Sequence, residues 1–246
     1  LRKARPDSDG QRGGVLVVPA FAVDRTEVVL WHLQELQRTG AVAALPVFVD
    51  SPMATRALAA YTEAAAAHDH DLRPELWDTP LFSDLDLHQA HTREESMVLD
   101  ERHGPFILVS ASGMATGGRI LHHLAARIGD PRNVVLLVGF QAPGTRGAAL
   151  ADGTRNLKMF GLYHRVRADV ARLVLSAHAD RDDLLDWVGT GTTPPETVFV
   201  VHGELDAAEA MADGIDRELD LPAVVPRNGE RVRLDGGHGM GTATTG

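Results

Sequence analysis

The sequence predicts an α/β fold in which a largely parallel sheet is flanked by helices on both faces. Apolar runs of β-type residues alternate with helical patterns from Gly13 to about Val138. The runs are mostly apolar at successive positions, which is typical of strands buried on both faces of a parallel sheet. Glycine-rich or polar segments follow several runs, at the strand ends where open α/β sheets place their binding groups.

The elements of this first part follow from local patterns. Apolar residues spaced as on one helix face predict a helix over residues 25–36. Ser51 and Pro52 form an N-cap and a first helical position, and they open an alanine-rich helix that extends to about residue 67. The polar stretch 68–95 is expected to be an irregular surface excursion. The remaining predictions are strands over 15–19, 46–49, 106–109 and 133–138, and a helix over 118–128.

After Gly153 the apolar segments become shorter and more β-rich, and we place a domain boundary near Gly161. The predicted division is a first domain over 1–161, a second domain over 162–235 and a disordered tail over 236–246, which has no core-forming residues. The elements predicted here are strands over 157–160, 163–166, 173–175, 197–201, 224–225 and 232–234, and helices over 182–188 and 206–219.

Composition excludes several classes of protein. The 246 residues contain no cysteine, so a metal site must use His, Asp or Glu, which favours zinc or manganese. No apolar run approaches the ~20 residues that span a bilayer, and no signal peptide is visible, so we expect a cytoplasmic protein whose sequence continues upstream of Leu1. A net charge of −10 argues against nonspecific coating of nucleic acid but permits a local basic track.

Two histidines follow apolar runs in the second part of the chain. His178 ends the run 172–177, and His202 ends the run 197–201. If both runs are neighbouring parallel strands, the two imidazoles reach one edge and form a shared site that binds a metal or moves a proton. The alternative is that each histidine is a structural residue at the end of a strand.

Two glycine-rich turns and two charged strand ends are candidates for anion binding. The turn Ser110–Arg119 follows a strand and opens a helix, and backbone N–H groups at such a helix start can bind a phosphate. The turn Phe140–Gly147 is similar, and its Arg146 could clamp phosphate. Asp24 with Arg25 and Asp50 with Ser51 stand at other strand ends. Ordinary turns, helix capping and a solvated arginine remain the alternatives.

Other histidine and aspartate groups are interpreted more simply. The run His68–Asp71 resembles a metal motif, but it lies in a loop-like stretch without rigid support. His122 and His123 point about 100° apart on a helix, so they do not chelate one ion. Asp180, Asp182 and Asp183 are expected to cap the start of a helix and interact with its dipole.

Taken in order, these segments resemble the β-CASP branch of the metallo-β-lactamase fold, which includes ribonuclease J and the endonuclease of cleavage and polyadenylation. The resemblance covers about residues 11–235 and is closest to the RNA-specific bacterial and archaeal members. It is carried by Gly13-Gly14 with Pro19–Arg25, Asp50–Pro52, Ser112–Arg119, Gly139–Gly147, Ser176–Asp180 and Val201–Glu204.

The resemblance implies a ribonuclease. Residues 1–161 would be a β-CASP domain incomplete at its N-terminus, and residues 162–235 would be the C-terminal strands and helices of a metallo-β-lactamase αββα domain. Two Zn²⁺ ions, or Mn²⁺, would serve hydrolysis of single-stranded RNA. His178 would act catalytically at the scissile phosphate, and His202 would bind zinc. The implied RNA-binding residues are Arg25, Ser112, Gly113, Gly117, Gly118, Arg119, Arg146 and Ser176. Family members also form homodimers.

The chain departs from the family pattern in ways that leave alternatives open. The His-x-His-x-Asp-His ligands are absent, so we expect this polypeptide alone to be inactive. Asp24 replaces the usual glycine before Arg25. A non-catalytic RNA-binding or scaffolding subunit is the main alternative. An ester hydrolase using Ser112 with His202 lacks the Gly-x-Ser-x-Gly motif, and a small anion-binding domain would leave the histidines unexplained.

Overall fold

The computed structural model describes residues 13–77, 80–173, 175 and 178–232 of the chain. It separates into two compact units, residues 1–176 and 177–246, which we treat one at a time. The predicted RNA-binding Ser176 and the predicted disordered tail 236–246 lie outside the described residues.

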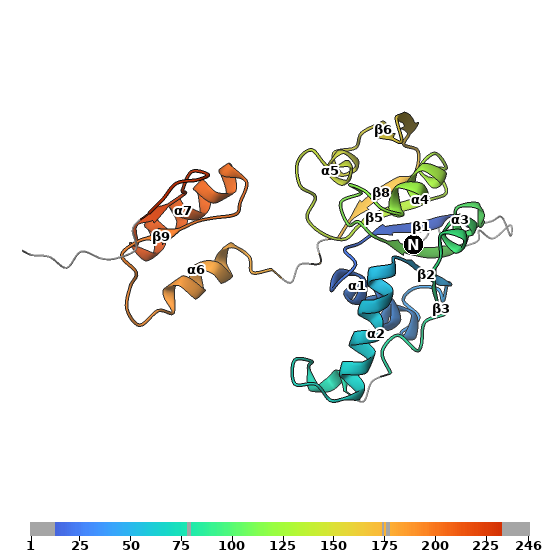
Figure 1. The fold of residues 1–246 in the computed structure, drawn as a ribbon, viewed down its shortest axis with the longest axis horizontal. Helices are drawn as coiled ribbons and strands as arrows, with labels where there is room; N and C mark the ends of the chain where they lie inside the picture. The colour runs from blue at the N-terminus through green and yellow to red at the C-terminus, as the bar shows by residue number, and fades with distance from the viewer. Residues whose placement is uncertain (1–12, 78–79, 174, 176–177, 233–246) are drawn as a thin grey trace, which may run out of the picture. The chain divides into compact units, whose positions relative to one another are not determined.

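Six parallel strands form the sheet of the first unit (Figure 1). Val17 on the central strand β1 pairs with Leu108 on one side and Val135 on the other, and all five β1 residues are buried. The predicted parallel α/β architecture is therefore confirmed. In spatial order the strands are β3 (Leu87–Gln89), β2 (Val47–Asp50), β4 (Phe106–Ser110), β1 (Val15–Pro19), β5 (Val134–Leu137) and β8 (Asp169–Arg172).

Helices cover both faces of this sheet, and the alternation of strand side chains divides the core into two layers. Leu16 and Val18 belong to one apolar cluster, whereas Val15 and Val17 belong to the other. The first cluster contains buried residues of α1 (Arg25–Arg38) and α2 (Pro52–Ala66). The second contains buried residues of α3 (Arg93–Glu101), α4 (Ile120–Arg127) and α5 (Arg146–Ala151).

The stretch 68–95 is more regular than its sequence suggested. It contains a short 3₁₀ turn, η2 (Pro74–Leu76), and the edge strand β3, and α3 begins within its last residues. Strand β3 has only three residues, too few to show a period, and it is defined by its parallel pairing with β2. Helix α5 was also missed, because the expected glycine-rich turn continues directly into it.

The strand β8 lies at Asp169–Arg172, where it pairs with β5, just before the strand predicted over 173–175. Residues 173 and 175 are not in a strand, and residue 174 lies outside the described residues. Strands β6 (Asn156–Met159) and β7 (Leu162–Arg165) form an antiparallel hairpin, close to the predictions. Phe160 and Gly161 form its turn with φ values of 50° and 80°. The boundary near Gly161 stays a prediction, although the compact units divide later, between residues 176 and 177.

The second unit contains two helices and a two-stranded parallel sheet. Asp180 caps α6 (Arg181–Gly189) by accepting hydrogen bonds from the backbone N–H groups of Asp182 and Asp183, as the sequence predicted. An ion pair between Arg181 and Glu218 connects α6 to α7 (Leu205–Leu219). Strands β9 (Val198–Phe199) and β10 (Ala223–Val224) pair in parallel.

Part of the strand predicted over 232–234 lies outside the described residues, and Val232 is not in a strand. Among the helices that the structure describes, none is long and apolar enough to cross a membrane.

Candidate nucleic-acid interface at the sheet edge

Four connecting segments meet at the carboxyl edge of the six-stranded sheet, because β1, β2, β4 and β5 run in the same direction. The backbone N–H of Ala20 donates to Ser110 O at 3.0 Å, which joins the ends of β1 and β4. The Gln141 side chain donates to Gly113 O at 3.2 Å, which joins the segment after β5 to the turn after β4. The structure thus brings together the Arg25, Ser112 and Arg146 segments that the sequence proposed for RNA.

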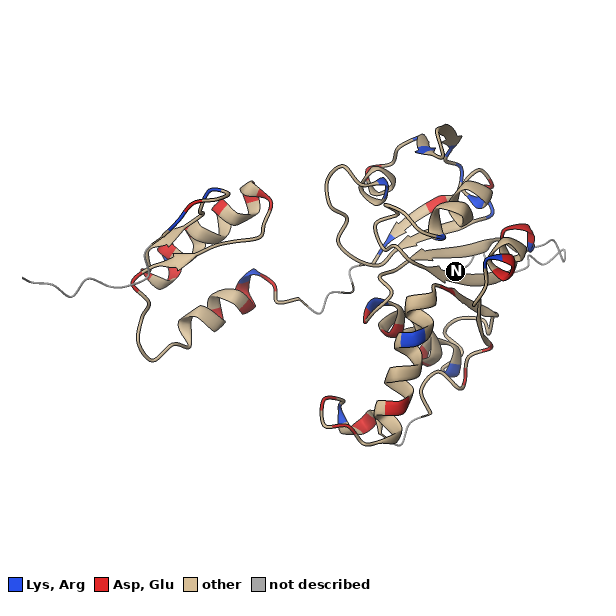
Figure 2. Ribbon diagram, viewed as in Figure 1, with Lys and Arg blue, Asp and Glu red and all other residues tan. Residues whose placement is uncertain are grey.

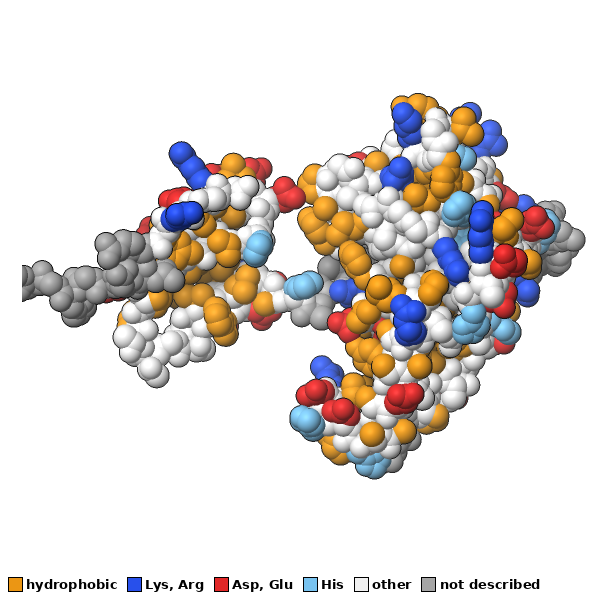
Figure 3. Space-filling view, viewed as in Figure 1, with side chains coloured by type: hydrophobic (Ala, Val, Ile, Leu, Met, Phe, Trp, Pro, Cys, Tyr) orange, Lys and Arg blue, Asp and Glu red, His pale blue; other side chains and the backbone are white. Residues whose placement is uncertain are grey.

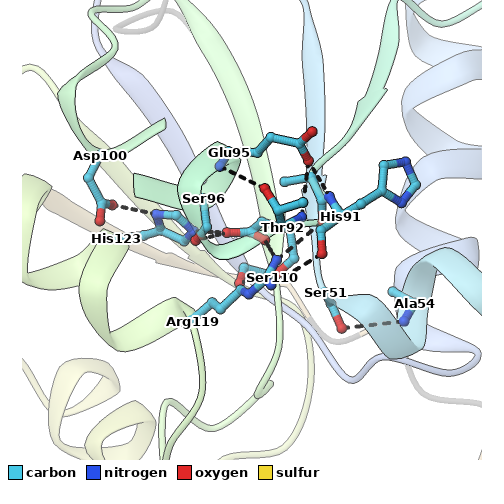
Figure 4. Close-up of polar contacts among 12 residues, drawn as sticks. Ser51, Ala54, His91, Thr92, Glu95, Ser96, Asp100, Ser110, Arg119 and His123 are labelled. Carbon is cyan, nitrogen blue, oxygen red and sulfur yellow. Dashed lines mark hydrogen bonds and ion pairs between the residues drawn. The ribbon is translucent and has the colours of Figure 1, made fainter. Parts of the chain in front are cut away.

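Asp50, at the end of β2, is the centre of a buried polar network. Figure 4 labels its partners Ser96, Arg119 and His123. One carboxylate oxygen accepts hydrogen bonds from Ser96 Oγ at 2.5 Å and His123 Nε2 at 2.7 Å. The other accepts one from Arg119 Nη1 at 2.5 Å. On the far side of the imidazole, His123 Nδ1 lies 2.6 Å from a carboxylate oxygen of Asp100. Asp50 and His123 are both fully buried.

The charges in this network stabilise one another. Burial disfavours the charged form of Asp50, but hydrogen bonds from His123, Ser96 and Arg119 outweigh it and hold the pKa of Asp50 below its usual value. Burial also disfavours the imidazolium, yet hydrogen bonds to Asp100 and Asp50 raise the pKa of His123 above its usual value. The network is therefore built for a charged histidine that donates to two carboxylates.

Sequence reasoning missed Ser96 and Asp100, and it considered His123 only as a metal ligand. A capping box between Thr92 and Glu95 begins α3, and it places Ser96 and Asp100 one helical turn apart on the same face. That S/T-x-x-E signal was present in the sequence and could have identified the helix. The pairing of this face with His123 of α4 depends on how the two helices pack, which no local pattern records.

The predicted role of Arg119 in RNA binding gains no support from its surroundings. Its guanidinium donates to the buried carboxylate of Asp50 and, at 3.2 Å, to the carbonyl oxygen of Ala90. The simplest interpretation is that Arg119 fixes the start of α4 against the end of β2.

The side chain of Ser112 forms hydrogen bonds within its own turn. Ser112 Oγ accepts hydrogen bonds from the backbone N–H groups of Thr116 at 3.0 Å and Gly117 at 3.4 Å, so these donors already have a partner. The same bonds remove support from the esterase alternative. A Cβ at Gly113 would lie 3.0 Å from Phe21, and one at Gly118 would lie 2.9 Å from Ala111 O, so both glycines serve close packing.

Arg25 and Arg146 differ in how their guanidinium groups are used. Arg146 Nε donates to Lys158 O at 2.7 Å and Nη1 donates to Thr116 O at 3.2 Å. Arg25 Nε is buried and has no hydrogen-bond partner in the part of the chain that the structure describes. Asp24 does not cap α1 as expected, because its side chain accepts a hydrogen bond from the Tyr61 hydroxyl. Arg25 is thus the predicted RNA-binding arginine with an unused donor at this edge.

The expectation that His178 and His202 share one site stays a prediction, because residues 174, 176 and 177 of the run before His178 lie outside the described residues. The strand before His178 is β8 of the six-stranded sheet, whereas the strand before His202 is β9 of the small sheet. Both histidines are exposed, and His202 has a positive φ of 65°.

The described residues do not assemble a zinc centre around His202. Within the described ranges, the one group of three metal-ligating side chains is Asp69, His70 and Asp71, whose ligand atoms lie within 4.8 Å of one another. This group lies on an exposed loop, and His70 is 3.5 Å from each aspartate. It does not include His178 or His202, so the donor set here does not fit a two-zinc centre.

Comparison with known families identifies the family to which this fold belongs. Residues 26–150 match the family described as the Beta-Casp domain. Residues 163–226 match the family described as the Zn-dependent metallo-hydrolase RNA specificity domain. The chain therefore belongs to the β-CASP family of metallo-β-lactamase-fold ribonucleases, as its motifs indicated.

Individual relatives agree with this assignment. The chain is 30% identical to transcription termination factor FttA of Pyrococcus abyssi over 91% of its own length and 36% of that protein. It is 34% identical to ribonuclease TTHA0252 of Thermus thermophilus over 81% of its length and 46% of that protein. An RNase J-like protein of Methanocaldococcus jannaschii is 29% identical over 89% of the chain and 50% of the relative. The chain thus spans half or less of these relatives.

Proposed function

We propose that this chain is the RNA-holding part of a metal-dependent ribonuclease that hydrolyses RNA phosphodiester bonds with two zinc ions. The observation that carries the proposal is the convergence of the Arg25, Ser112 and Arg146 segments at one sheet edge of a β-CASP domain. Phosphate contacts need little sequence information, so such an edge would accept many single-stranded RNAs.

The residues have separate proposed roles. Arg25 contacts phosphate through its guanidinium group, whose buried Nε has no hydrogen-bond partner among the described residues. Ser112 and Arg146 hold the neighbouring turns in place. His178 acts at the leaving oxygen of the scissile phosphate, and His202 is a metal ligand in the whole protein, as the family resemblance implies. Because no group of three or more metal-ligating side chains among the described residues includes His202, the chain alone binds RNA without cleaving it.

The test measures binding and cleavage separately. The purified chain is mixed with fluorescent single-stranded RNA, with and without zinc or manganese, and is expected to bind without cutting. Arg25→Ala should weaken binding and lower the dependence of log K on log salt concentration by about 0.7, the value for one phosphate contact on a single strand. Arg38→Ala, at the far end of the same helix, is the matched control.

Two results would contradict the proposal. Metal-dependent cleavage that disappears in His178→Ala would show that the chain is active by itself. Equal RNA affinity of wild type, Arg25→Ala and Arg38→Ala would remove Arg25 from the interface.

A non-catalytic RNA-binding subunit is the second candidate. It is favoured by the same observation that argues against activity, the lack of a ligand group around His202 among the described residues. The two candidates differ in the longer protein that contains this chain: cleavage of the labelled RNA indicates the nuclease, and binding without cleavage at saturating metal indicates the subunit.

A further inference from the structure

The hairpin β6–β7 presents a polar, aromatic outer face that packing does not explain. Along β6, Leu157 and Met159 are buried, whereas the alternate residues Asn156 and Lys158 are exposed. The register places Lys158 opposite Tyr163 and Asn156 opposite Arg165, and all four side chains are exposed. The outer face therefore carries the ring of Tyr163, with Lys158 opposite it on β6 and Arg165 two residues further along β7.

The ring of Tyr163 is accessible to a ligand. Tyr163 is 72% exposed, so its ring buries little surface against the rest of the unit. Lys158 Nζ lies 5.7 Å from the ring centroid, within the range of a cation–π interaction. An exposed ring next to an ammonium group is the combination on which single-stranded nucleic acids stack their bases and place their phosphates.

A groove connects this hairpin face to the sheet edge. It has a volume of about 430 Å³, and its lining includes Thr116, Thr145, Arg146, Lys158 and Tyr163. Arg146 holds its two sides together, because its guanidinium donates to Lys158 O of the hairpin and to Thr116 O of the turn after β4. The groove therefore runs from the Ser112 turn to the aromatic ring.

The charge of this region is opposite to that of the whole chain. Residues 146–172 contain six Lys or Arg and two Asp, although the chain has a net charge of −10. Figure 2 shows basic residues on β6–β7 and around α5, and Figure 3 shows Lys and Arg side chains beside apolar ones at the same end of the unit. Local positive charge in an acidic protein favours an anionic ligand at this place.

We propose that this groove is a nucleotide subsite in which a base of single-stranded RNA stacks on Tyr163 and the adjoining phosphates contact Lys158 and Arg165. The inference rests on the proposed RNA function and adds a place for the strand beyond the sheet edge. It assigns binding by base stacking, which every base can supply, and therefore no sequence preference.

The first experiment compares the affinity of chain variants for a fluorescent single-stranded RNA by anisotropy. Tyr163→Ala should weaken binding about 5- to 100-fold, the range that base stacking on an aromatic side chain produces. Tyr163→Trp should keep the wild-type affinity because it keeps a stacking ring. Trp187→Ala is the matched control, since Trp187 is 73% exposed in the other unit, and it should leave affinity unchanged.

The second experiment tests stacking itself. RNA carrying 5-iodouridine is photocrosslinked to the chain, and the crosslinked peptide is expected to contain Tyr163. An RNA with abasic positions keeps the phosphates and lacks the bases, so Tyr163→Ala should have much less effect on its binding. An equal effect on both RNAs would overturn stacking.

The outcomes separate this inference from the proposed function. If the wild-type chain binds RNA and Tyr163→Ala binds equally well, the subsite is wrong and the proposed function stands. If the wild-type chain binds no RNA, both fail. Phe160, Leu162 and Tyr163 could instead contact a second copy of the chain. Sedimentation that shows a dimer dissociated by Tyr163→Ala, with RNA affinity following the dimer, would overturn the subsite in favour of that contact.

Discussion

Two buried carboxylates of the first unit lie on opposite faces of the sheet and differ in their partners. Asp50 shares a fully partnered network with residues of α3 and α4, and its pKa is held below its usual value. Glu27 lies in the first turn of α1, is only 4% exposed, and neither carboxylate oxygen has a hydrogen-bond partner among the described residues. Burial and the nearby Asp24 raise the pKa of Glu27 to about 7.

The difference shows that hydrogen-bonding partners can outweigh the effect of burial on the pKa of a buried acid. Asp50 has an imidazole, a hydroxyl and a guanidinium directed at it. Near Glu27 the available hydroxyl, that of Tyr61, donates to Asp24 instead, and this hydrogen bond raises the pKa of Tyr61 to about 12. The carboxylate of Asp50 is therefore fully partnered, while that of Glu27 has no hydrogen-bond partner among the described residues.

Breaking the complete network should have the largest effect. His123→Leu removes the group between Asp50 and Asp100 and leaves buried negative charge, so the free energy of unfolding should fall by about 3–5 kcal/mol, measured by urea denaturation at pH 6. His122→Leu is the matched control on an exposed neighbouring position and should change stability by less than about 1 kcal/mol. Equal losses in the two variants would contradict a network centred on His123.

Neutralising the carboxylate of Glu27 should have a smaller, opposite effect. The pKa of Glu27 is raised in the folded state, so the folded protein favours the protonated carboxyl group. The resulting contribution to the free energy of unfolding is complete below the ordinary pKa of 4.5 and is lost as the pH rises through about 7. Glu27→Gln should therefore raise the free energy of unfolding by about 1–3 kcal/mol at pH 8 and change it little at pH 4.5. Glu63→Gln, on α2, is the control for removing a negative charge. A benefit that is independent of pH would argue against ionisation as the cause.

The smallest predicted effect concerns the capping box that begins α3. Thr92→Ala removes the hydroxyl that accepts from the Glu95 backbone N–H at 3.1 Å and should lower the free energy of unfolding by about 1 kcal/mol. Thr92→Ser keeps the cap and should be close to neutral. If Thr92→Ala is as damaging as His123→Leu, the helix start and not the buried network supports this face.

Much of the fold was accessible from local patterns. The strands at 15–19, 47–50, 106–110 and 134–137 were predicted to within one residue at each end because they are apolar runs. Helices α1 and α7 were predicted from apolar residues at helical spacing, and α2 from its Ser51–Pro52 start. Helices α4 and α6 were predicted as well. The order of strands in the sheet, the edge strand β3 and helix α3 were not predicted. They depend on pairing and packing between distant segments, for which a short polar stretch carries little signal.

Only part of the candidate site could be predicted from local sequence patterns. The sequence identified the turns proposed to bind anions, and parallel strands bring those turns to one edge of the sheet. It did not reveal that Arg119 is bound to Asp50 or that Asp50 does more than begin a helix. The Asp50 partners come from residues 96, 119 and 123, far from it in the chain.

By itself, the sequence determined the α/β class, the family and the turns that meet at the carboxyl edge of the sheet. The tertiary structure decided which charged groups are used internally and which remain for a ligand. Asp50 and Arg119 are satisfied within the fold, whereas Arg25 keeps a donor and Tyr163 keeps an exposed ring. The physical reason is that burial follows a local period of apolar residues, while the partner of a polar group is set by packing between segments distant in the chain.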